Sequence, residues 1–341
     1  MGCRSWGVRG ARWCIVTGYP RHGHVHPHGH DPLALLKWCR FERHLHFPLE
    51  GVVTSMQRKG TLFPEFTYVV DKTKAYEFTK AIGDELRQVE GEFFVPIGMM
   101  LFVVVQDGES IFKALNVTWK QVFLGGVKLK YHRPMKVGDT LRGKMECIAY
   151  NNPGIIELET RYSDEVGNEV LHEISTLIVS GETNGNEVET SRSGSDMNTG
   201  HRKQESVLHY ECSVDRLAIA WMAVALEDPN LIHVEDRVAQ EAGFPTVIAH
   251  GTFPIGAIGA MLAQWAGEEN MLELDIRLVA PTFPGNSIRV EGSILERVDK
   301  KQTVEVVVRQ KDQIVARGRA IVNAQERETL RPNSFVQEDL P

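Results

Sequence analysis

Residues 252–266 read TFPIGAIGAMLAQWA, a stretch in which almost every position is either large and apolar or very small. The large side chains recur at the three- and four-residue spacing of one helical face, at Ile255, Ile258, Met261, Leu262 and Trp265. The positions between them are mostly Gly and Ala, so the helix has no polar face. Such a helix has to be enclosed by other parts of the protein. The stretch therefore predicts a helix buried at the centre of a domain.

Strand patterns surround this helix. After it, apolar and charged residues alternate over 272–278, and the alternation returns over 304–308. Before it, a similar alternation covers 127–131, and residues typical of strands fill three further stretches, 141–150, 155–162 and 170–180. A buried helix with an antiparallel sheet, made twice, predicts the α+β class.

The two sides of the chain match each other in order. Residues 71–84 (DKTKAYEFTKAIGD) and 215–228 (DRLAIAWMAVALED) have the same length and similar ends. Further on, PxxxGDTLR at 134–142 corresponds to PxxxGNSIR at 281–289. The offset between the copies is 144 residues for the first pair and 147 for the second, which a small insertion explains. We interpret this as an internal duplication.

A polar segment separates the two copies. Residues 181–206 contain almost no large apolar side chain and cannot support a core. The sequence therefore predicts an N-terminal unit at 56–182, a linker at 183–206, a C-terminal unit at 207–325 and a tail at 326–341.

The first 55 residues have a different composition. They hold three of the five Cys and seven of the thirteen His, and His22 to His30 alternate through five positions. Alternating imidazoles can bind Zn, Cu or Ni, but the interleaved Gly and Pro favour an unfolded leader or sequence upstream of a start at Met56. Four Arg before Asp31 leave a mitochondrial presequence open, whereas a secretory signal lacks its apolar core.

The overall composition excludes several classes of protein. A net charge of −7 does not suit a nucleic-acid partner, and no apolar run is long enough to span a bilayer. Five unpaired-looking cysteines favour a reducing compartment, and we expect a cytoplasmic location. Edge strands in both units leave room for a homodimer.

The sequence EDPNLIH at 227–233 brings a carboxylate, an amide and an imidazole together where a helix ends. Pro229 stops the helix that starts near Asp215, and a second short helix is expected from Val234 to Ala242. On the turn between these helices, Asp228 and His233 can converge for general acid–base chemistry. Taken alone, the same residues are also typical of a polar turn that only closes a helix.

The start of the buried helix supplies the second part of the pattern, IAHGT at 248–252. Thr252 is expected to cap the helix, and Gly251 would let a substrate carbonyl approach the unpaired backbone N–H groups. His250, Thr252 and Phe253 are expected to contact the substrate, although His250 by itself is also typical of a structural histidine.

Together, DPNLIH at 228–233, AGFP at 242–245 and IAHG at 248–251 resemble the signature of the MaoC-like, hydratase-2 type family of hot-dog enoyl-thioester hydratases and dehydratases. The resemblance covers about residues 60–325 and implies a double hot-dog, each half a central helix wrapped by an antiparallel sheet. It also implies hydration of trans-2-enoyl thioesters to (R)-3-hydroxyacyl thioesters, or the reverse dehydration, as a hydro-lyase without metal or cofactor. Its implied catalytic residues are Asp228, His233, Asn230, which orients them, and Gly251, whose N–H holds the thioester oxygen.

The chain departs from that signature in two positions, since Glu227 replaces its glycine and Leu231 its proline. The first half keeps Gly83-Asp84 but has no histidine after it. We therefore expect a degenerate first half that shapes an acyl tunnel, with Asp84 as a helix terminator.

Two other functions stay open for the same fold: an acyl-CoA thioesterase, and a non-catalytic acyl-thioester-binding subunit of a hetero-oligomeric dehydratase. The carrier, CoA or acyl carrier protein, is also open.

Overall fold

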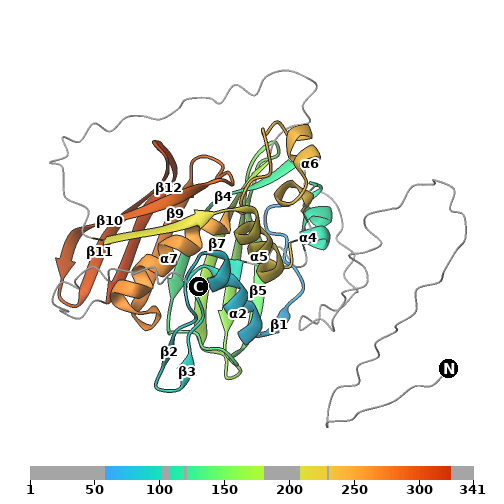
Figure 1. Cartoon of the computed structure of the whole chain (residues 1–341). Coiled ribbons are helices and arrows are strands. Elements are labelled where there is room, and N and C mark those ends of the chain that lie inside the picture. Colours follow the sequence, from blue (N-terminus) through green and yellow to red (C-terminus); the bar gives the residue numbers. More distant parts are fainter. Residues whose placement is uncertain (1–57, 102–107, 119–120, 180–207, 229, 324–341) are drawn as a thin grey trace, which may run out of the picture. The chain divides into compact units, whose positions relative to one another are not determined.

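The computed structural model describes residues 58–101, 108–118, 121–179, 208–228 and 230–323 (Figure 1). The predicted leader, linker and tail lie outside the described residues. In the first half the elements are β1 (Phe66–Val69), α2 (Lys72–Ala81), β2 (Gln88–Val89), β3 (Glu92–Phe93), η2 (Met99–Leu101), α4 (Gly108–Leu115), β4 (Val122–Tyr131), β5 (Thr140–Tyr150), β6 (Gly154–Ser163) and β7 (Glu169–Val179).

The second half also begins with one strand, followed by helices and then by four long strands. Its elements are β8 (Leu208–Val214), α5 (Arg216–Leu226), η4 (Leu231–His233), α6 (Asp236–Glu241), α7 (Thr252–Ala266), η5 (Glu268–Asn270), β9 (Met271–Leu278), β10 (Asn286–Val298), β11 (Lys301–Gln310) and β12 (Gln313–Asn323).

Ten strands form one antiparallel sheet in the order β1-β5-β6-β7-β4-β9-β12-β11-β10-β8. The halves meet at β4 and β9, where Val127 lies opposite Ile276 and Leu129 opposite Leu274. The mixture of one large antiparallel sheet with separate helices confirms the α+β prediction.

The duplicated stretches occupy corresponding places. Asp71 caps α2 by accepting a hydrogen bond from the N–H of Lys74 (3.0 Å), and Asp215 caps α5 through the N–H of Ala218 (2.7 Å). The two capped helices pack against each other, and Figure 1 shows them side by side. An N-cap carboxylate stabilises a helix by about 1 kcal/mol, so the same local signal starts both helices.

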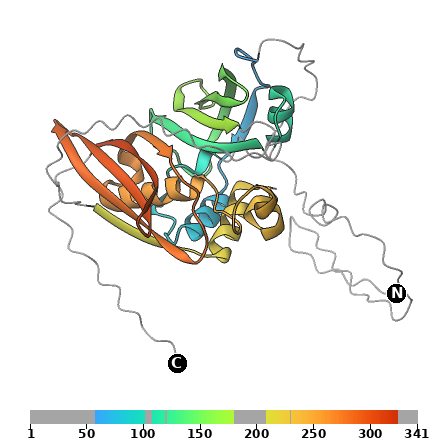
Figure 2. The same ribbon diagram turned by 90° about the horizontal axis from the view of Figure 1, so that it is seen from above.

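The buried helix predicted from its composition is α7, with the bounds expected from the sequence. It packs against β8 to β12, and the view from above shows it within the curve of the orange and red strands (Figure 2). The glycines of α7 allow side chains of the first half to pack closely against the helix. A Cβ on Gly256 would lie 2.9 Å from Phe78, and one on Gly259 would lie 2.7 Å from Ile97. Larger residues there would separate the halves.

The first half has a helix of its own against its strands. Helix α4 buries Ile111, Phe112 and Leu115 in a cluster with residues of β4 to β7, including Leu158.

Within the described ranges, no helix is long and apolar enough to cross a membrane.

Candidate active site

The turn after α5 is built by backbone geometry. Glu227 adopts the left-handed conformation (φ 52°, ψ 36°), and the N–H of Asp228 donates to the carbonyl of Ala223 (3.0 Å). This closure reverses the chain at the end of the helix. A short 3₁₀ turn, η4, ends at His233, and α6 follows at Asp236. The predicted placement of 227–233 between two helices is confirmed, with the second helix shorter than expected.

Asp228 and His233 converge on this turn. His233 Nε2 lies 3.6 Å from Asp228 Oδ2, and both side chains are about nine-tenths buried. The N–H of Asn230 donates to Asp228 Oδ1 (2.8 Å) and fixes the carboxyl. His233 Nδ1 donates to the carbonyl of Ile248 (2.8 Å), because a carbonyl can only accept. That bond leaves the lone pair of Nε2 on the side of Asp228.

His250 lies against the same pair. Its ring stacks on that of His233, with centroids 3.7 Å apart and planes at 26°. Its Nε2 is 3.6 Å from Asp228 Oδ2, so two imidazoles share one carboxyl oxygen. Neither ring nitrogen of His250 has a hydrogen-bond partner within the described part of the chain, and its side chain is almost fully buried. A buried polar group of this kind is expected to meet a ligand or water.

Burial controls the protonation of this cluster. Loss of solvent raises the pKa of Asp228, against the smaller opposing effects of His233 and of the Asn230 N–H. Loss of solvent also lowers the pKa of His233, and it lowers that of His250 well below its usual range, with His233 contributing to the second shift. Both directions favour the neutral forms, a carboxylic acid and an imidazole, more than in the free side chains.

A cavity of about 460 Å³ opens beside the cluster. Its walls include Asp228, Asn230, His233 and the residues 248–252. The first half contributes a mostly apolar wall, formed by Leu101, Phe112, Val122, Leu124, Leu177 and Ile178. A space of this size and lining is typical of a site for a small, largely apolar ligand.

The first turn of α7 borders the cavity. Gly251, rather than the predicted Thr252, is the N-cap residue, and the helix begins at Thr252. The first N–H groups of a helix have no acceptor within it. That of Phe253 donates to the carbonyl of His250 (2.9 Å), so the N–H groups of Gly251 and Thr252 are the candidate donors to an oxygen in the cavity. The hydroxyl of Thr252 is buried on the cavity wall without a hydrogen-bond partner in the described residues.

Phe253 is not part of the cavity wall. Its side chain is fully buried in the main core, among residues of both halves. The prediction that Phe253 contacts substrate is therefore not supported by its position. The helix turns by about 100° per residue, so its second residue points into the protein when its first faces the cavity.

Asp228, His233 and His250 could also hold a metal ion, since one ligand atom from each lies within 4.8 Å of the others. The same atoms serve the acid–base pair, so a metal ion there would compete with proton transfer. The prediction of a metal-free site stays a prediction.

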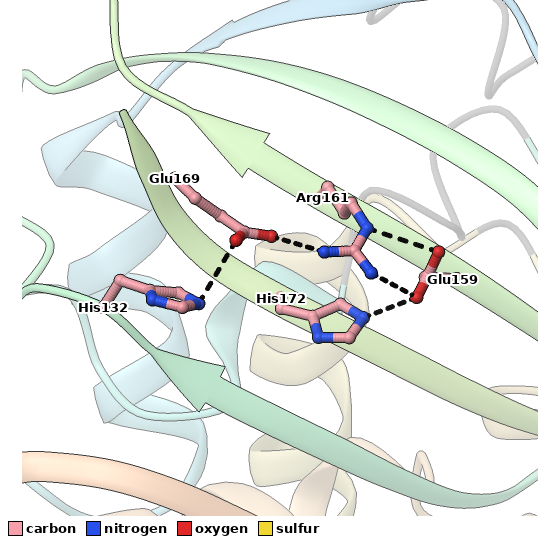
Figure 3. A network of polar contacts seen from close by, with 5 residues as sticks. All are labelled: His132, Glu159, Arg161, Glu169 and His172. Carbon is pink, nitrogen blue, oxygen red and sulfur yellow. Dashed lines mark hydrogen bonds and ion pairs between the residues drawn. The ribbon is translucent and has the colours of Figure 1, made fainter. Parts of the chain in front are cut away.

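A second polar network lies on the first-half sheet (Figure 3). His172 Nε2 contacts Glu159 (2.7 Å), and Arg161 bonds both Glu159 and Glu169 (2.9 Å each). His132 Nε2 is 3.4 Å from Glu169. Each carboxylate has a guanidinium or imidazole partner, and the side chains are partly accessible to solvent, which is typical of a network that joins neighbouring strands.

Residues 198–315 match the family model described as MaoC like domain. This part of the chain is a MaoC-like domain. The chain is also 31% identical over 94 residues to peroxisomal multifunctional enzyme type 2 of Drosophila melanogaster, which is 27% of this chain and 15% of that protein. The chain thus matches only a small part of that relative.

Solved structures place the MaoC-like domain within a larger fold. A structure named MaoC-like dehydratase covers 79% of this chain and 98% of its own, with a TM-score of 0.63 and 18% identity. A conserved hypothetical protein from Mycobacterium tuberculosis, described as having a double hot-dog fold, covers 78% and 96% with a TM-score of 0.52 and 17% identity. The predicted double hot-dog fold and MaoC-like relationship are confirmed.

Sequence reasoning missed two features next to the cavity. One is the carbonyl of Ile248, which sets the tautomer of His233 and cannot be recognised from a side chain. The other is the pair Glu173 and Ser175 on β7, of which Ser175 reaches the cavity. A signal for this pair exists: in the alternation of 169–179 the carboxylate falls at an inward position.

Proposed function

We propose that the protein hydrates trans-2-enoyl thioesters to (R)-3-hydroxyacyl thioesters, or catalyses the reverse dehydration. One observation carries the proposal: a buried carboxyl and an imidazole, 3.6 Å apart, face a cavity of about 460 Å³ whose first-half wall is mostly apolar. An acyl chain suits the apolar wall, and the polar pair suits the addition of water to a double bond.

The protonation of the pair suggests how the protons move. Neutral His233 accepts a proton from water at Nε2 while the water oxygen bonds to C3 of the enoyl group. Asp228, as the carboxylic acid, donates its proton to C2. One hydrogen and one hydroxyl are thereby added, and a proton passing from His233 to Asp228 across 3.6 Å restores the starting state.

The start of α7 would stabilise the negative charge that develops on the thioester oxygen. The N–H of Gly251 is the expected donor, because it stands at the N-cap of a fifteen-residue helix beside the pair. Asn230 acts by position: its N–H holds the Asp228 carboxyl, and its side-chain oxygen accepts from the N–H of Ile232 (3.2 Å).

The test is hydration of crotonyl-CoA by the full-length protein with chiral analysis of the product. Wild type is expected to form (R)-3-hydroxybutyryl-CoA, and His233→Ala to lose about 10²–10⁴-fold in rate while remaining folded. Undiminished hydration by His233→Ala would overturn the assignment of the base.

The same assay separates the alternatives. Free CoA without a 3-hydroxyacyl product would favour a thioesterase. Tight binding of acyl-CoA without turnover would favour a non-catalytic subunit, a role compatible with Glu227 and Leu231 at the two altered signature positions. Acyl carrier protein in place of CoA, a homodimer and a cytoplasmic location are further parts of the proposal, tested by substrate comparison, sedimentation and cell fractionation.

A further inference from the structure

A buried carboxyl stands in the core of the first half, behind the cavity wall. Glu173 on β7 is fully buried. The hydroxyl of Ser175 donates to Glu173 Oε1 (2.8 Å), and the hydroxyl of Tyr162 lies 3.5 Å from Glu173 Oε2. Ser175 is itself one of the residues that line the cavity. The carboxyl therefore reaches the cavity through one hydroxyl.

The second half shows that the fold does not require these polar groups. On β7, Glu173 lies opposite Leu129 of β4. The corresponding strand pair is β12 and β9, in which Gly318 lies opposite Ile276. Two residues along, the second half has Ala320 where the first has Ser175. In the second half, the positions equivalent to Glu173 and Ser175 are therefore occupied by the small residues Gly318 and Ala320.

A buried carboxyl at Glu173 lowers the stability of the fold, so packing does not explain its presence. Burial raises the pKa of Glu173 to about 7, against weaker opposing hydrogen bonds from Ser175 and Tyr162. A buried carboxyl without a charged partner is costly, and an apolar replacement is often neutral or stabilising. The pair sits next to the cavity, and that position suggests a role in binding.

We propose that Ser175 is a polar subsite that binds a hydroxyl group carried on the acyl chain, away from the thioester. An ionised Glu173 can only accept, so in that state the proton of Ser175 is directed to Glu173 and the serine oxygen is left as an acceptor for a ligand in the cavity. An acceptor favours a hydroxyl over a ketone, which can only accept, and over a carboxylate, which would be repelled by ionised Glu173. Glu173 acts through Ser175 and is a positioning residue. This inference rests on the proposed use of the cavity for an acyl thioester.

The experiment compares 2-enoyl-CoA substrates in matched pairs, with and without a terminal hydroxyl, across a series of chain lengths. At the length that reaches Ser175, wild type is expected to prefer the hydroxylated member by about tenfold in kcat/KM, the value of one neutral hydrogen bond. Ser175→Ala should abolish that preference. Thr176→Ala, on the opposite face of the same strand, is the matched control and should retain it.

A second variant tests the role of Glu173. In Glu173→Gln the amide can donate to Ser175, which frees the serine proton for the cavity. The preference for a hydroxylated chain over a keto chain of equal length should then narrow or reverse. An unchanged preference in both Ser175→Ala and Glu173→Gln at every length would overturn the inference.

Failure of the proposed reaction can be separated from failure of the subsite. If no enoyl-CoA is hydrated, calorimetric affinities of saturated acyl-CoA and ω-hydroxyacyl-CoA replace the rates. A preference for the hydroxylated ligand that Ser175→Ala removes would support the subsite without the reaction. Equal affinities, or no binding of either ligand, would overturn it.

Discussion

The two halves end corresponding helices in the same way and then use the next residues differently. At the end of α2 the N–H of Asp84 donates to the carbonyl of Thr79 (2.9 Å), and at the end of α5 the N–H of Asp228 donates to that of Ala223 (3.0 Å). Each closure leaves an aspartate at the start of the following turn. The geometry of Asp84 agrees with its prediction as a helix terminator.

What fills the space around each aspartate differs. In the first half, Arg87 donates to the carbonyl of Ala263 (2.8 Å) and contacts Glu268 (3.2 Å), and Gln264 donates to Asp84 (3.2 Å). In the second half, an imidazole and an open cavity occupy the neighbourhood of the carboxyl. The hydrogen bond that closes each helix only positions the carboxyl of the following aspartate. The chemistry of that carboxyl depends on the side chains and the space around it.

The largest expected effect separates the two aspartates. Asp228→Asn should lower crotonyl-CoA hydration by about 10²–10⁴-fold, because the amide cannot transfer the proton. Asp84→Asn should change the rate by less than about twofold, since an amide oxygen can still accept from Gln264. Steady-state rates of both variants test the comparison, and equal losses would contradict it.

The first half carries a titratable group, Glu173, at a buried sheet position where the second half has Gly318, so only the first half should respond to pH there. The pKa of Glu173 is about 7 in the folded protein against an ordinary value of 4.5. Stability from this group is therefore complete below about pH 4.5 and is lost as pH rises through about 7, by roughly 3 kcal/mol. Glu173→Gln should match wild type near pH 4.5 and exceed it by about that amount near pH 8.

Urea unfolding at several pH values measures this difference, with the exposed Glu165→Gln variant as control. A constant difference between Glu173→Gln and wild type across the range would contradict the buried carboxyl.

Two glycines near the start of α7 should affect different measured quantities: Gly251 the reaction rate, and Gly98 of the first half, whose added Cβ would lie 2.9 Å from Ile255 of α7, the stability of the fold. A Cβ on Gly251 would lie 2.8 Å from Leu278 and 3.0 Å from Leu124, so Gly251→Ala should displace the donor and lower kcat/KM by about 10²-fold. Gly98 has a φ of 87°, so Gly98→Ala should cost at least about 1 kcal/mol of stability with little change in rate per folded molecule. Kinetics and thermal unfolding of both variants separate these outcomes.

The smallest effect concerns the left-handed residue before each aspartate. It is Gly83 (φ 73°) in the first half and Glu227 (φ 52°) in the second. Glu227→Gly removes a backbone cost of about 1 kcal/mol but also a half-exposed ion pair with Lys74 (3.1 Å), so we expect a gain below about 1 kcal/mol. Gly83→Ala should lose about 1 kcal/mol. Urea midpoints test both variants. If Glu227→Gly lost as much unfolding free energy as Gly83→Ala, the left-handed conformation of Glu227 would carry no backbone cost, contrary to this prediction.

Much of the fold is predictable because its signals are local. The absence of a polar face marks residues 252–266 as a buried helix, and the caps Asp71 and Asp215 mark the repeated helices. The convergence of Asp228 and His233 follows from a helix that ends just before Asp228 and a turn that carries both residues. Each of these signals involves residues that are close in sequence.

The rest depends on residues distant in the chain. Thr252 and Gly251 are both acceptable helix starts, and the close approach of Leu124 and Leu278 to Gly251 is a contact between distant residues that the local sequence does not report. The inward direction of Phe253 depends on the rotation of α7 within its sheet. The proximity of Ser175 to the cavity arises from the first half folding against the second, which no local pattern reports.

The ladder between β4 and β9 has a consequence for how such a protein can change. It joins the halves within one chain, from Gly126 opposite Arg277 to Lys130 opposite Glu273. In a dimer of identical chains every substitution appears twice, at both sites. Here a substitution appears once, so one half can lose its histidine or acquire a buried glutamate while the other keeps its own residues. The ladder also needs no encounter between chains, and dilution should leave the pairing of the halves intact.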